Sequence, residues 1–328
     1  MTHKPHTKAS WPGRLPELDT HKQQQLEQRL LPVFESLLAE ERIQQDQAFI
    51  EGLKCLYIPF CAWLIKQQKD KALIVGINGA QGSGKSTLTR ILAAILEQGF
   101  DKKVISFSID DFYLARDRRA ELAGDVHPLF KTRGVPGTHD SALGISVLKQ
   151  LLQGNGSELV IPVFDKSIDD RMPESSWTRV KSDADIVIFE GWCVGSVAEE
   201  QQALVSPVNE LEAMEDEGAV WRRYVNHQLQ SEYAEWFSFI DILVMLKIPD
   251  FNKVYEWRLL QEQKLIASLA DDQNRKDKTM SEPEINRFIM HYERISRHTL
   301  NEMPARADVV MQLRDDHRVG NVMLRSKQ

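Results

Sequence analysis

The chain has 328 residues, of which 42% are hydrophobic and 27% are charged, and its formal net charge is −7 at pH 7. This length suits one large domain or two ordinary ones, and the negative balance argues against a nucleic-acid-binding surface as the main feature. The three cysteines follow neither metal-type nor disulfide spacing, and the N-terminus lacks an apolar signal segment. The longest uncharged apolar run, 55–65, is shorter than the roughly 20 residues that span a bilayer. We therefore expect a cytoplasmic protein with neither nucleic acid nor a membrane as its partner.

The first 70 residues precede the first predicted strand. Residues 1–19 are polar and without hydrophobic periodicity, which predicts a disordered tail. Apolar side chains then recur at helical spacing over 23–68, with breaks expected at Pro32 and Pro59. We expect this helical N-terminal extension, 1–70, to cover one side of the core, and a role in an interface stays open.

A phosphate-binding motif directly follows the first predicted strand, 72–77. It satisfies every fixed position of G-x-x-x-x-G-K-[ST] and leads into a helical pattern. Glycines let successive backbone N–H groups surround phosphate oxygens, and the start of the helix adds positive potential. We expect Lys85 to reach the β- and γ-phosphates of ATP and Ser86 to ligate Mg²⁺. The predicted cofactor-binding residues are Gly79, Ala80, Gln81, Gly82, Ser83, Gly84, Lys85, Ser86 and Thr87.

Four further apolar runs predict the rest of a parallel sheet. They alternate with helical segments, which is typical of an α/β fold with helices on both faces of the sheet. Ligands of such sheets bind at the carboxyl ends of the strands, so the residues that follow each run are candidates for chemistry. These runs are 104–109, 186–189, 242–246 and 309–313, and with the first strand they make at least five strands.

Carboxylates follow two of these strands. Asp110 and Asp111 end the second strand, and Glu190 ends the third. Phosphoryl transfer requires an acceptor hydroxyl held in line and a group that accepts its proton, and we expect Asp110 to do this. The alternative for Asp110 is a cap of the following turn, which is common for aspartate. Glu190 is expected to hold Mg²⁺ through a water or to polarise the acceptor site.

The segment from Ser108 to Tyr113 resembles the S-x-D-x-F-Y segment of the phosphoribulokinase, uridine kinase and pantothenate kinase superfamily. Within that group, the segments 133–140 and 257–262 resemble those of D-glycerate 3-kinases and their relatives. The similarity extends from about residue 72 to residue 313. It implies a three-layer P-loop NTPase fold over 71–328, with a five-stranded parallel sheet, a helical lid, and Asp110 as the catalytic base.

The resemblance also implies an acceptor site. Arg133, His139 and Asp140 fall where the superfamily binds its acceptor, and 162–165 followed by Arg171 resembles a P-x-Y-D segment that contacts the nucleoside in uridine kinases. Phe164 replaces the tyrosine, which argues against a nucleoside. Arg133 favours a small hydroxy acid because guanidinium and carboxylate pair bidentately, although it is also compatible with a plain surface arginine. The predicted substrate-binding residues are Asp111, Tyr113, Arg133, His139, Asp140, Asp165 and Arg171.

Arg258 takes the place of the lid arginine of the superfamily, where it neutralises charge on the transferring phosphoryl group. The alternative role for Arg258 is an ordinary ion pair within the helix with Glu262, four positions on, and the polar segment 271–278 is the expected hinge of the lid.

The leading hypothesis is an ATP- and Mg²⁺-dependent kinase of a small-molecule hydroxyl, first of all D-glycerate. The alternatives are a kinase of another sugar acid, a pantothenate-like molecule or a nucleoside, and a non-kinase ATP-dependent switch protein. The oligomeric state stays open.

Overall fold

A six-stranded sheet forms the centre of the molecule. The computed structural model describes residues 18–43, 46–268 and 280–325, and the strand order in its main sheet is β10-β9-β8-β1-β7-β2. Five of these strands are parallel, as predicted, and the sixth, β10, pairs antiparallel with β9 at one edge. The strands are β1 (Leu73–Gly79), β2 (Val104–Ser108), β7 (Ile186–Gly191), β8 (Ile242–Lys247), β9 (Val309–Leu313) and β10 (Val319–Leu324).

The central strands are buried along their whole length. Every residue of β1 and β7 is buried, and Val75 of β1 lies between Ile188 of β7 and Ile242 of β8. Strands covered on both faces favour continuous β-branched runs over alternation. The sequence pattern therefore predicted these strands correctly, and their carboxyl ends meet at one edge of the sheet.

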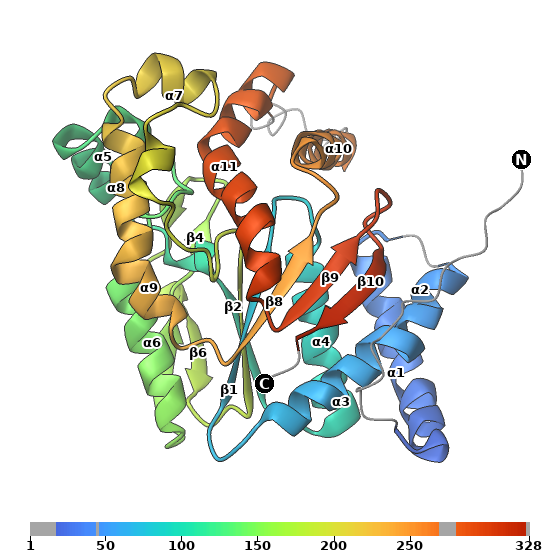
Figure 1. The fold of residues 1–328 in the computed structure, drawn as a ribbon. Coiled ribbons are helices and arrows are strands. Elements are labelled where there is room, and N and C mark those ends of the chain that lie inside the picture. Colours follow the sequence, from blue (N-terminus) through green and yellow to red (C-terminus); the bar gives the residue numbers. More distant parts are fainter. Residues whose placement is uncertain (1–17, 44–45, 269–279, 326–328) are drawn as a thin grey trace, which may run out of the picture.

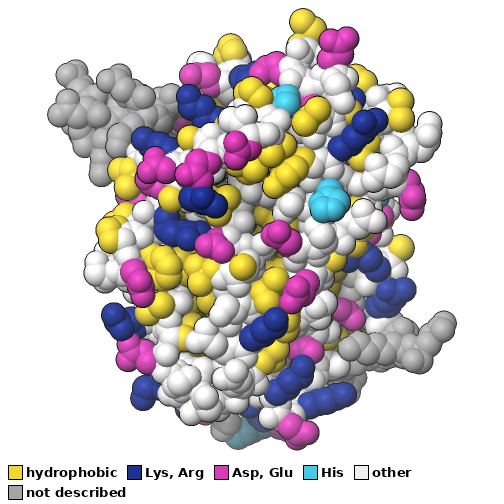
Figure 2. Space-filling model, turned by 90° about the vertical axis from the view of Figure 1, so that its left-hand side faces the viewer, with side chains coloured by type: hydrophobic (Ala, Val, Ile, Leu, Met, Phe, Trp, Pro, Cys, Tyr) yellow, Lys and Arg dark blue, Asp and Glu magenta, His cyan; other side chains and the backbone are white. Residues whose placement is uncertain are grey.

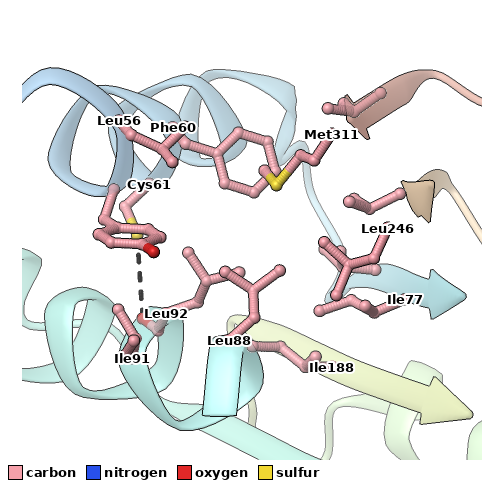
Figure 3. Packing of buried hydrophobic residues seen from close by; sticks show 14 of the residues in the cluster. Leu56, Phe60, Cys61, Ile77, Leu88, Ile91, Leu92, Ile188, Leu246 and Met311 are labelled. Atoms are coloured by element: carbon pink, nitrogen blue, oxygen red, sulfur yellow. Dashed lines mark hydrogen bonds between the residues drawn. The ribbon is translucent and has the colours of Figure 1, made fainter. Parts of the chain in front are cut away.

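Helices cover both faces of the sheet, which gives the three-layer α/β fold (Figure 1). The N-terminal helices and α4 pack on one face, in a core of leucine, isoleucine and aromatic side chains (Figure 3). On the other face α6, α8 and α9 pack, α10 lies beyond the carboxyl ends of the strands, and α11 runs from there down over this face, where Leu300 packs against β8. The longer helices after the N-terminal region are α4 (Lys85–Phe100), α5 (Arg116–Asp125), α6 (Ser141–Gln153), α7 (Glu210–Glu215), α8 (Val220–Gln230), α9 (Glu232–Phe237), α10 (Asn252–Ser268) and α11 (Glu282–Glu302).

Short elements occupy the connections. Two small antiparallel sheets, β3 (Glu158–Ile161) with β6 (Thr178–Lys181) and the hairpin β4 (Phe164–Asp165) with β5 (Asp170–Arg171), follow α6 and were not predicted from the sequence. A 3₁₀ turn, η2, directly follows β2 and contains both aspartates of the predicted pair. The described 3₁₀ turns are η2 (Ile109–Phe112), η3 (Pro128–Lys131), η4 (Glu174–Ser176), η5 (Gln201–Leu204) and η7 (Met303–Ala305).

The N-terminal extension is helical, as predicted, but its prolines do not break it where expected. Helix α1 (Thr20–Glu40) continues through Pro32, and Pro59 lies just after a π-helical turn, at the start of α3 (Ile58–Gln67) and inside a continuous helix. Helix α2 (Gln47–Gly52) and the π-helical turn η1 (Leu53–Tyr57) run directly into α3. The predicted tail lies outside the described residues except for its last two.

The continuous helix over 47–67 is longer than the sequence pattern indicated. Its 21 residues, with a mean hydropathy of 1.5 in the most apolar window, satisfy the length and composition of a membrane span, which corrects the expectation drawn from the shorter run. Its apolar side nevertheless has partners within the protein: 44% of that window is buried, Cys61 contacts Leu92 of α4, and Phe60 lies beside Met311 of β9 (Figure 3). The segment is therefore a core helix of this fold.

The face formed by the helices on the left of Figure 1 carries charges of both signs. Figure 2 shows Lys and Arg side chains interspersed with Asp and Glu over this face, with hydrophobic side chains between them. No basic patch gathers on the part of this face that is described and drawn in colour.

Candidate active site

The phosphate loop between β1 and α4 requires glycine for physical reasons. Gly82 and Gly84 have φ of +77° and +85°, a region that side chains with a Cβ rarely adopt. A Cβ on Gly79 would lie 2.5 Å from the Ser83 hydroxyl oxygen. Gln81 Oε1 and Ser83 Oγ are buried and find no hydrogen-bond partner among the described residues. The loop therefore fits a polyphosphate, which would occupy the concave side of its backbone.

Two side chains at the start of α4 carry the predicted cation and metal ligand. Lys85 Nζ donates to the carbonyl oxygen of Ala80 at 3.0 Å, and Ser86 Oγ donates to Glu190 Oε1 at 2.9 Å. Burial lowers the pKa of Lys85, while the carboxylates of Glu190 and Asp110 act to raise it. Lys85, Asp110 and Glu190 thus share one site. Thr87, in contrast, donates to Glu41 Oε2 at 3.0 Å and contacts the N-terminal extension.

The donor set around Ser86 fits Mg²⁺ rather than a metal held by protein alone. Among the residues described by the structure, no group of three or more His, Cys, Asp or Glu side chains has metal-site geometry. Mg²⁺ usually keeps several waters and binds one or two protein oxygens together with substrate phosphates. The hydroxyl of Ser86 and the carboxylate of Glu190 are oxygen ligands of that kind.

The two neighbouring aspartates of η2 have different surroundings. Asp110 accepts hydrogen bonds from the Tyr113 hydroxyl at 3.0 Å and from Lys166 Nζ at 2.6 Å. Burial acts to raise the pKa of Asp110, but the Lys166 ammonium more than offsets it, so this pKa lies below its ordinary value. Asp110 is therefore a carboxylate that faces Lys85 across the site.

Asp111 closes the turn instead. Its carboxylate accepts from the backbone N–H of Ser108 at 2.9 Å, and the Ser108 hydroxyl in return caps the start of η2. Burial raises the pKa of Asp111 to about 6, and the neighbouring carboxylates of Asp110 and Glu190 act in the same direction. The capping role considered for Asp110 thus falls to Asp111, which the sequence analysis had placed with the substrate-binding residues.

Arg133 and its loop lie beside the β4–β5 hairpin. The Arg133 guanidinium pairs with the Asp169 carboxylate, and its carbon lies 5.5 Å from the centroid of the Phe164 ring. The Arg133 side chain is 24% exposed, so solvent reaches the guanidinium. An arginine held over an aromatic ring and paired with a partly exposed aspartate can exchange that partner for a ligand carboxylate.

Arg171 and Asp140 hold the acceptor loops together. The Arg171 guanidinium donates to the backbone oxygens of Phe112 and Tyr113, at 3.1 and 3.0 Å, and to Asp140 Oδ2 at 3.1 Å. Asp140 also caps α6 through the N–H of Leu143 at 3.1 Å. These donors and acceptors are engaged within the protein, so both residues position the segment that carries Asp110. Asp165 likewise accepts from the N–H of Ser167 at 2.8 Å, within the hairpin turn.

His139 lies deeper in the same loop. It is 4% exposed, its ring stacks on that of Tyr113 with centroids 4.4 Å apart, and its Nδ1 lies 2.6 Å from the Tyr233 hydroxyl. Burial lowers the pKa of His139 to about 3, so its imidazole is neutral at physiological pH. The prediction that His139 and Tyr113 lie near Asp110 agrees with this geometry.

Arg258 of helix α10 lies between Glu262 of the same helix and Phe288 of α11. The guanidinium pairs with Glu262 at 2.8 Å, the alternative considered from the sequence, and lies 5.8 Å from the Phe288 ring centroid of α11. The neighbouring Trp257 contacts the phosphate loop, because a Cβ on Gly82 would lie 2.9 Å from Trp257 Cβ. The predicted hinge of the lid, 271–278, lies outside the described residues.

Sequence reasoning missed several residues of this site. Lys166 directly follows the 162–165 segment and is the ion-pair partner of Asp110. His317, in the β9–β10 turn, stacks on Trp257 with centroids 4.0 Å apart and lies 3.1 Å from the Gly82 carbonyl oxygen through Nδ1. Tyr233 comes from α9, far from any motif. The position of Lys166 beside a quoted motif was a usable signal, whereas His317 and Tyr233 are placed by the tertiary fold alone.

The comparisons with known proteins agree with this geometry, although no family model matches the chain. The chain is 38% identical over 252 residues to the uncharacterized kinase mug58 of Schizosaccharomyces pombe, a match that covers 74% of this chain and 87% of that one. It is 32% identical over 228 residues to the chloroplastic D-glycerate 3-kinase of Arabidopsis thaliana, covering 67% of this chain and 46% of the plant protein.

A solved structure shares the fold over nearly the whole chain. The D-glycerate 3-kinase of Cryptococcus neoformans matches with a TM-score of 0.64 at 23% identity, over 92% of this chain and 98% of that one. More distant relatives include pantothenate kinases of Streptococcus, 27% identical over 161 residues. The chain therefore belongs to the small-molecule P-loop kinases of the phosphoribulokinase, uridine kinase and pantothenate kinase superfamily.

Proposed function

We propose that this kinase transfers the γ-phosphoryl group of ATP, with Mg²⁺, to a hydroxyl of D-glycerate. The observation that carries the proposal is the hydrogen bond from Ser86 to Glu190 beside Lys85, whose charge both Glu190 and Asp110 influence. It joins the phosphate-loop cation, the candidate base and the candidate metal ligand in one site. Residues 71–328 carry all of these groups, and we assign the kinase domain to them, with 1–70 as its helical extension.

Each group has a role in phosphoryl transfer. The loop backbone and Lys85 bind and orient the phosphates, and Ser86 and Glu190 would hold Mg²⁺, which would neutralise charge on the phosphate oxygens. Asp110 accepts the proton of the acceptor hydroxyl and holds its oxygen in line for attack. Arg258 remains the candidate for neutralising the transferring group, which requires it to leave Glu262 for the phosphates. The bond from phosphorus to the leaving oxygen breaks as the bond to the acceptor oxygen forms.

Two basic side chains on the acceptor side support a hydroxy acid as the substrate. Arg133 and Lys166 are both paired with carboxylates of the protein, Asp169 and Asp110. The carboxylate of an acceptor would take over one or both of these partners, as charge-assisted hydrogen bonds favour. When Lys166 leaves Asp110 for the acceptor, it frees the base beside the hydroxyl that reacts.

This role of Lys166 has a measurable consequence for pH dependence. Lys166 lowers the pKa of Asp110, so Lys166→Met is expected to raise it. A base acts above its pKa, and the acid limb of kcat/KM should therefore move to higher pH in the variant. A pH-rate profile of Lys166→Met beside that of the exposed Lys149→Met tests this. An acid limb that moves to lower pH, or not at all, would contradict this role of Lys166.

The substrate assignment is tested by coupling ADP release to a panel of acceptors. D-glycerate, a second sugar acid, pantothenate and uridine are compared at equal concentration with a control without acceptor and with the Asp110→Asn variant. The proposal expects stimulation by D-glycerate that depends on Asp110. Stimulation by uridine or pantothenate alone would support the kinase activity and contradict D-glycerate as its substrate. ADP release that no acceptor increases would favour an ATP-dependent switch protein.

The cytoplasm is the proposed compartment of this reaction. Cys55, Cys61 and Cys193 form no disulfide, and two of them are buried in the core. Cysteines outside disulfides are usual in reducing compartments.

A further inference from the structure

The acceptor side of the active site contains a buried histidine with one unpaired nitrogen. His139 Nε2 is buried and has no hydrogen-bond partner among the described residues. A buried polar group without a partner is costly, and native proteins retain such groups mainly where function uses them. The ring stacks on Tyr113, and the hydroxyl of Tyr113 bonds to Asp110, so the unpaired nitrogen belongs to the cluster around the candidate base.

Tyr233 determines which nitrogen of this ring carries the proton. Its hydroxyl oxygen accepts the backbone N–H of Gly137 at 3.0 Å, and the same oxygen lies 2.6 Å from His139 Nδ1. Burial raises the pKa of Tyr233 well above its ordinary value, so the hydroxyl keeps its proton. Within the part of the chain that is described, Nδ1 is the acceptor within reach of that proton. Tyr233 therefore donates to Nδ1, and the single proton of the neutral ring resides on Nε2.

The groups that act on the ring do not change this conclusion. The charged side chains that influence His139 are Asp110, which favours the imidazolium, and Arg171, which disfavours it. Burial acts in the same direction as Arg171, outweighs the effect of Asp110 and keeps the ring neutral. Tyr113 and Tyr233 pack against the ring as uncharged phenols, since burial raises the pKa of each well above its ordinary value.

We propose that His139, held as its Nε2–H tautomer by Tyr233, donates a hydrogen bond to an oxygen of the bound acceptor close to the hydroxyl that reacts, and that Tyr233 is a positioning residue for this contact. The inference rests on the proposed function, because it assigns a contact within the same acceptor site. It defines the acceptor further: beside the reacting hydroxyl it carries a second oxygen that accepts a hydrogen bond. A neutral donor in a buried site distinguishes such an acceptor from one that lacks the oxygen.

The tautomer is tested directly by NMR, without any acceptor. In protein labelled with ¹⁵N-histidine, long-range ¹H–¹⁵N correlation identifies the protonated nitrogen of each ring, and the His139→Gln variant assigns the signal of His139. We expect the Nε2–H form from pH 5.5 to pH 8.5 in the wild type. We expect a second, Nδ1–H population in Tyr233→Phe, which loses the donor to Nδ1. An Nδ1–H ring in the wild type, or an imidazolium near neutral pH, would overturn the proposal.

Kinetics test the contact with the acceptor. Tyr233→Phe is expected to raise the KM for the acceptor about tenfold, with the KM for ATP unchanged, and His139→Phe to raise it tenfold to a hundredfold. His139→Gln, whose amide can donate near the Nε2 position, should recover part of the loss. Tyr57→Phe removes a buried hydroxyl from the N-terminal extension and serves as the matched control. Melting temperatures of all variants separate these effects from loss of fold.

The two proposals fail in different ways. If the acceptor panel identifies another substrate, the tautomer and the KM effect are measured with that substrate and the inference stands. If D-glycerate is the substrate but Tyr233→Phe and His139→Phe leave its KM unchanged, the inference fails and the proposed function stands.

Discussion

The nucleotide half and the acceptor half of this active site are built in different ways. The nucleotide half consists of consecutive residues, 79–87, whose backbone geometry follows from glycines and from the start of α4, and it takes Glu190 from the neighbouring strand. The acceptor half collects side chains from the end of β2, the 133–140 loop, the β4–β5 hairpin and α9, and long-range hydrogen bonds hold them. A backbone cradle survives most changes around it, whereas a site assembled from side chains depends on each contact.

The largest effect is expected in the nucleotide half, from Lys85→Ala. This change removes the cation at the phosphates and leaves the backbone cradle, so turnover should fall by several orders of magnitude while the fold is retained. Steady-state kinetics beside circular dichroism measure both. Lys102→Ala, which alters a lysine just beyond the other end of α4, is the control and should keep near-normal activity. Near-normal activity in soluble Lys85→Ala would contradict the phosphate-loop assignment.

Asp110→Asn tests where the two halves meet. It keeps the size of the side chain and abolishes the proton acceptor, so kcat should fall by about 10² to 10⁴ with ATP binding retained. Nucleotide binding by calorimetry and turnover by ADP release separate the two effects. Asp111→Asn is the matched control and should be mild, because its amide oxygen can still accept from Ser108. If Asp111→Asn were crippling and Asp110→Asn mild, the roles within the pair would be reversed.

A smaller effect, confined to the acceptor half, is expected from Arg133→Lys. A lysine cannot reproduce the bidentate fork, so the KM for the acid acceptor should rise by about tenfold to a hundredfold, and more than that for ATP. Initial rates over both substrate concentrations give the two constants. Arg179→Lys, which alters an exposed arginine of strand β6, is the control. An unchanged acceptor KM would contradict the assignment of Arg133 as the residue that binds the acceptor carboxylate, and the substrate assignment would stand.

The smallest effect concerns stability and Asp111. Its pKa is raised to about 6 in the folded protein from an ordinary value of 3.8, so between these values the folded state holds a proton that the unfolded state releases. The contribution of Asp111 to stability is therefore lost as pH rises from about 4 to about 6. Relative to the wild type, Asp111→Asn should gain on the order of 1 to 2 kcal/mol in unfolding free energy across that window.

Urea unfolding at pH 4.5 and pH 7 measures this difference. Asp110→Asn gives the opposite sign, because the pKa of Asp110 is lowered and its contribution is lost only as pH falls. Equal differences at both pH values for Asp111→Asn would show that Asp111 titrates normally.

The contrast between the two halves also explains what could be predicted from the sequence. The parallel strands, the phosphate loop and Glu190 follow from local patterns, because buried strands and glycine-dependent turns depend on near neighbours along the chain. The sixth strand, β10, was not predicted because Gly320 and Asn321 interrupt its apolar run: Val319 stands alone before them, and only Val322, Met323 and Leu324 are consecutive.

The acceptor half could be predicted only in part. Resemblance located Arg133 and His139, but not Asp169 and Tyr233, which the fold brings to them. Nor did it locate Lys166, which the fold brings to Asp110. The role of Asp110 as the base stays a prediction, as does substrate binding by Asp111, and the structure adds that the carboxylate of Asp111 caps the turn η2. A capping bond to Ser108 depends on the exact turn after β2, which the pattern of residue types does not specify.

Arg171 has a consequence for how kinases of this superfamily diverge. It connects the β4–β5 hairpin to the backbone that carries Asp110, and the same hairpin supplies Lys166. Changes in the length or composition of that hairpin can thus alter which acceptor is recognised, while one guanidinium keeps the base in register with the phosphate loop. Recognition of new metabolites can therefore evolve by exchange of a short peripheral segment, and the inherited chemistry of transfer is preserved.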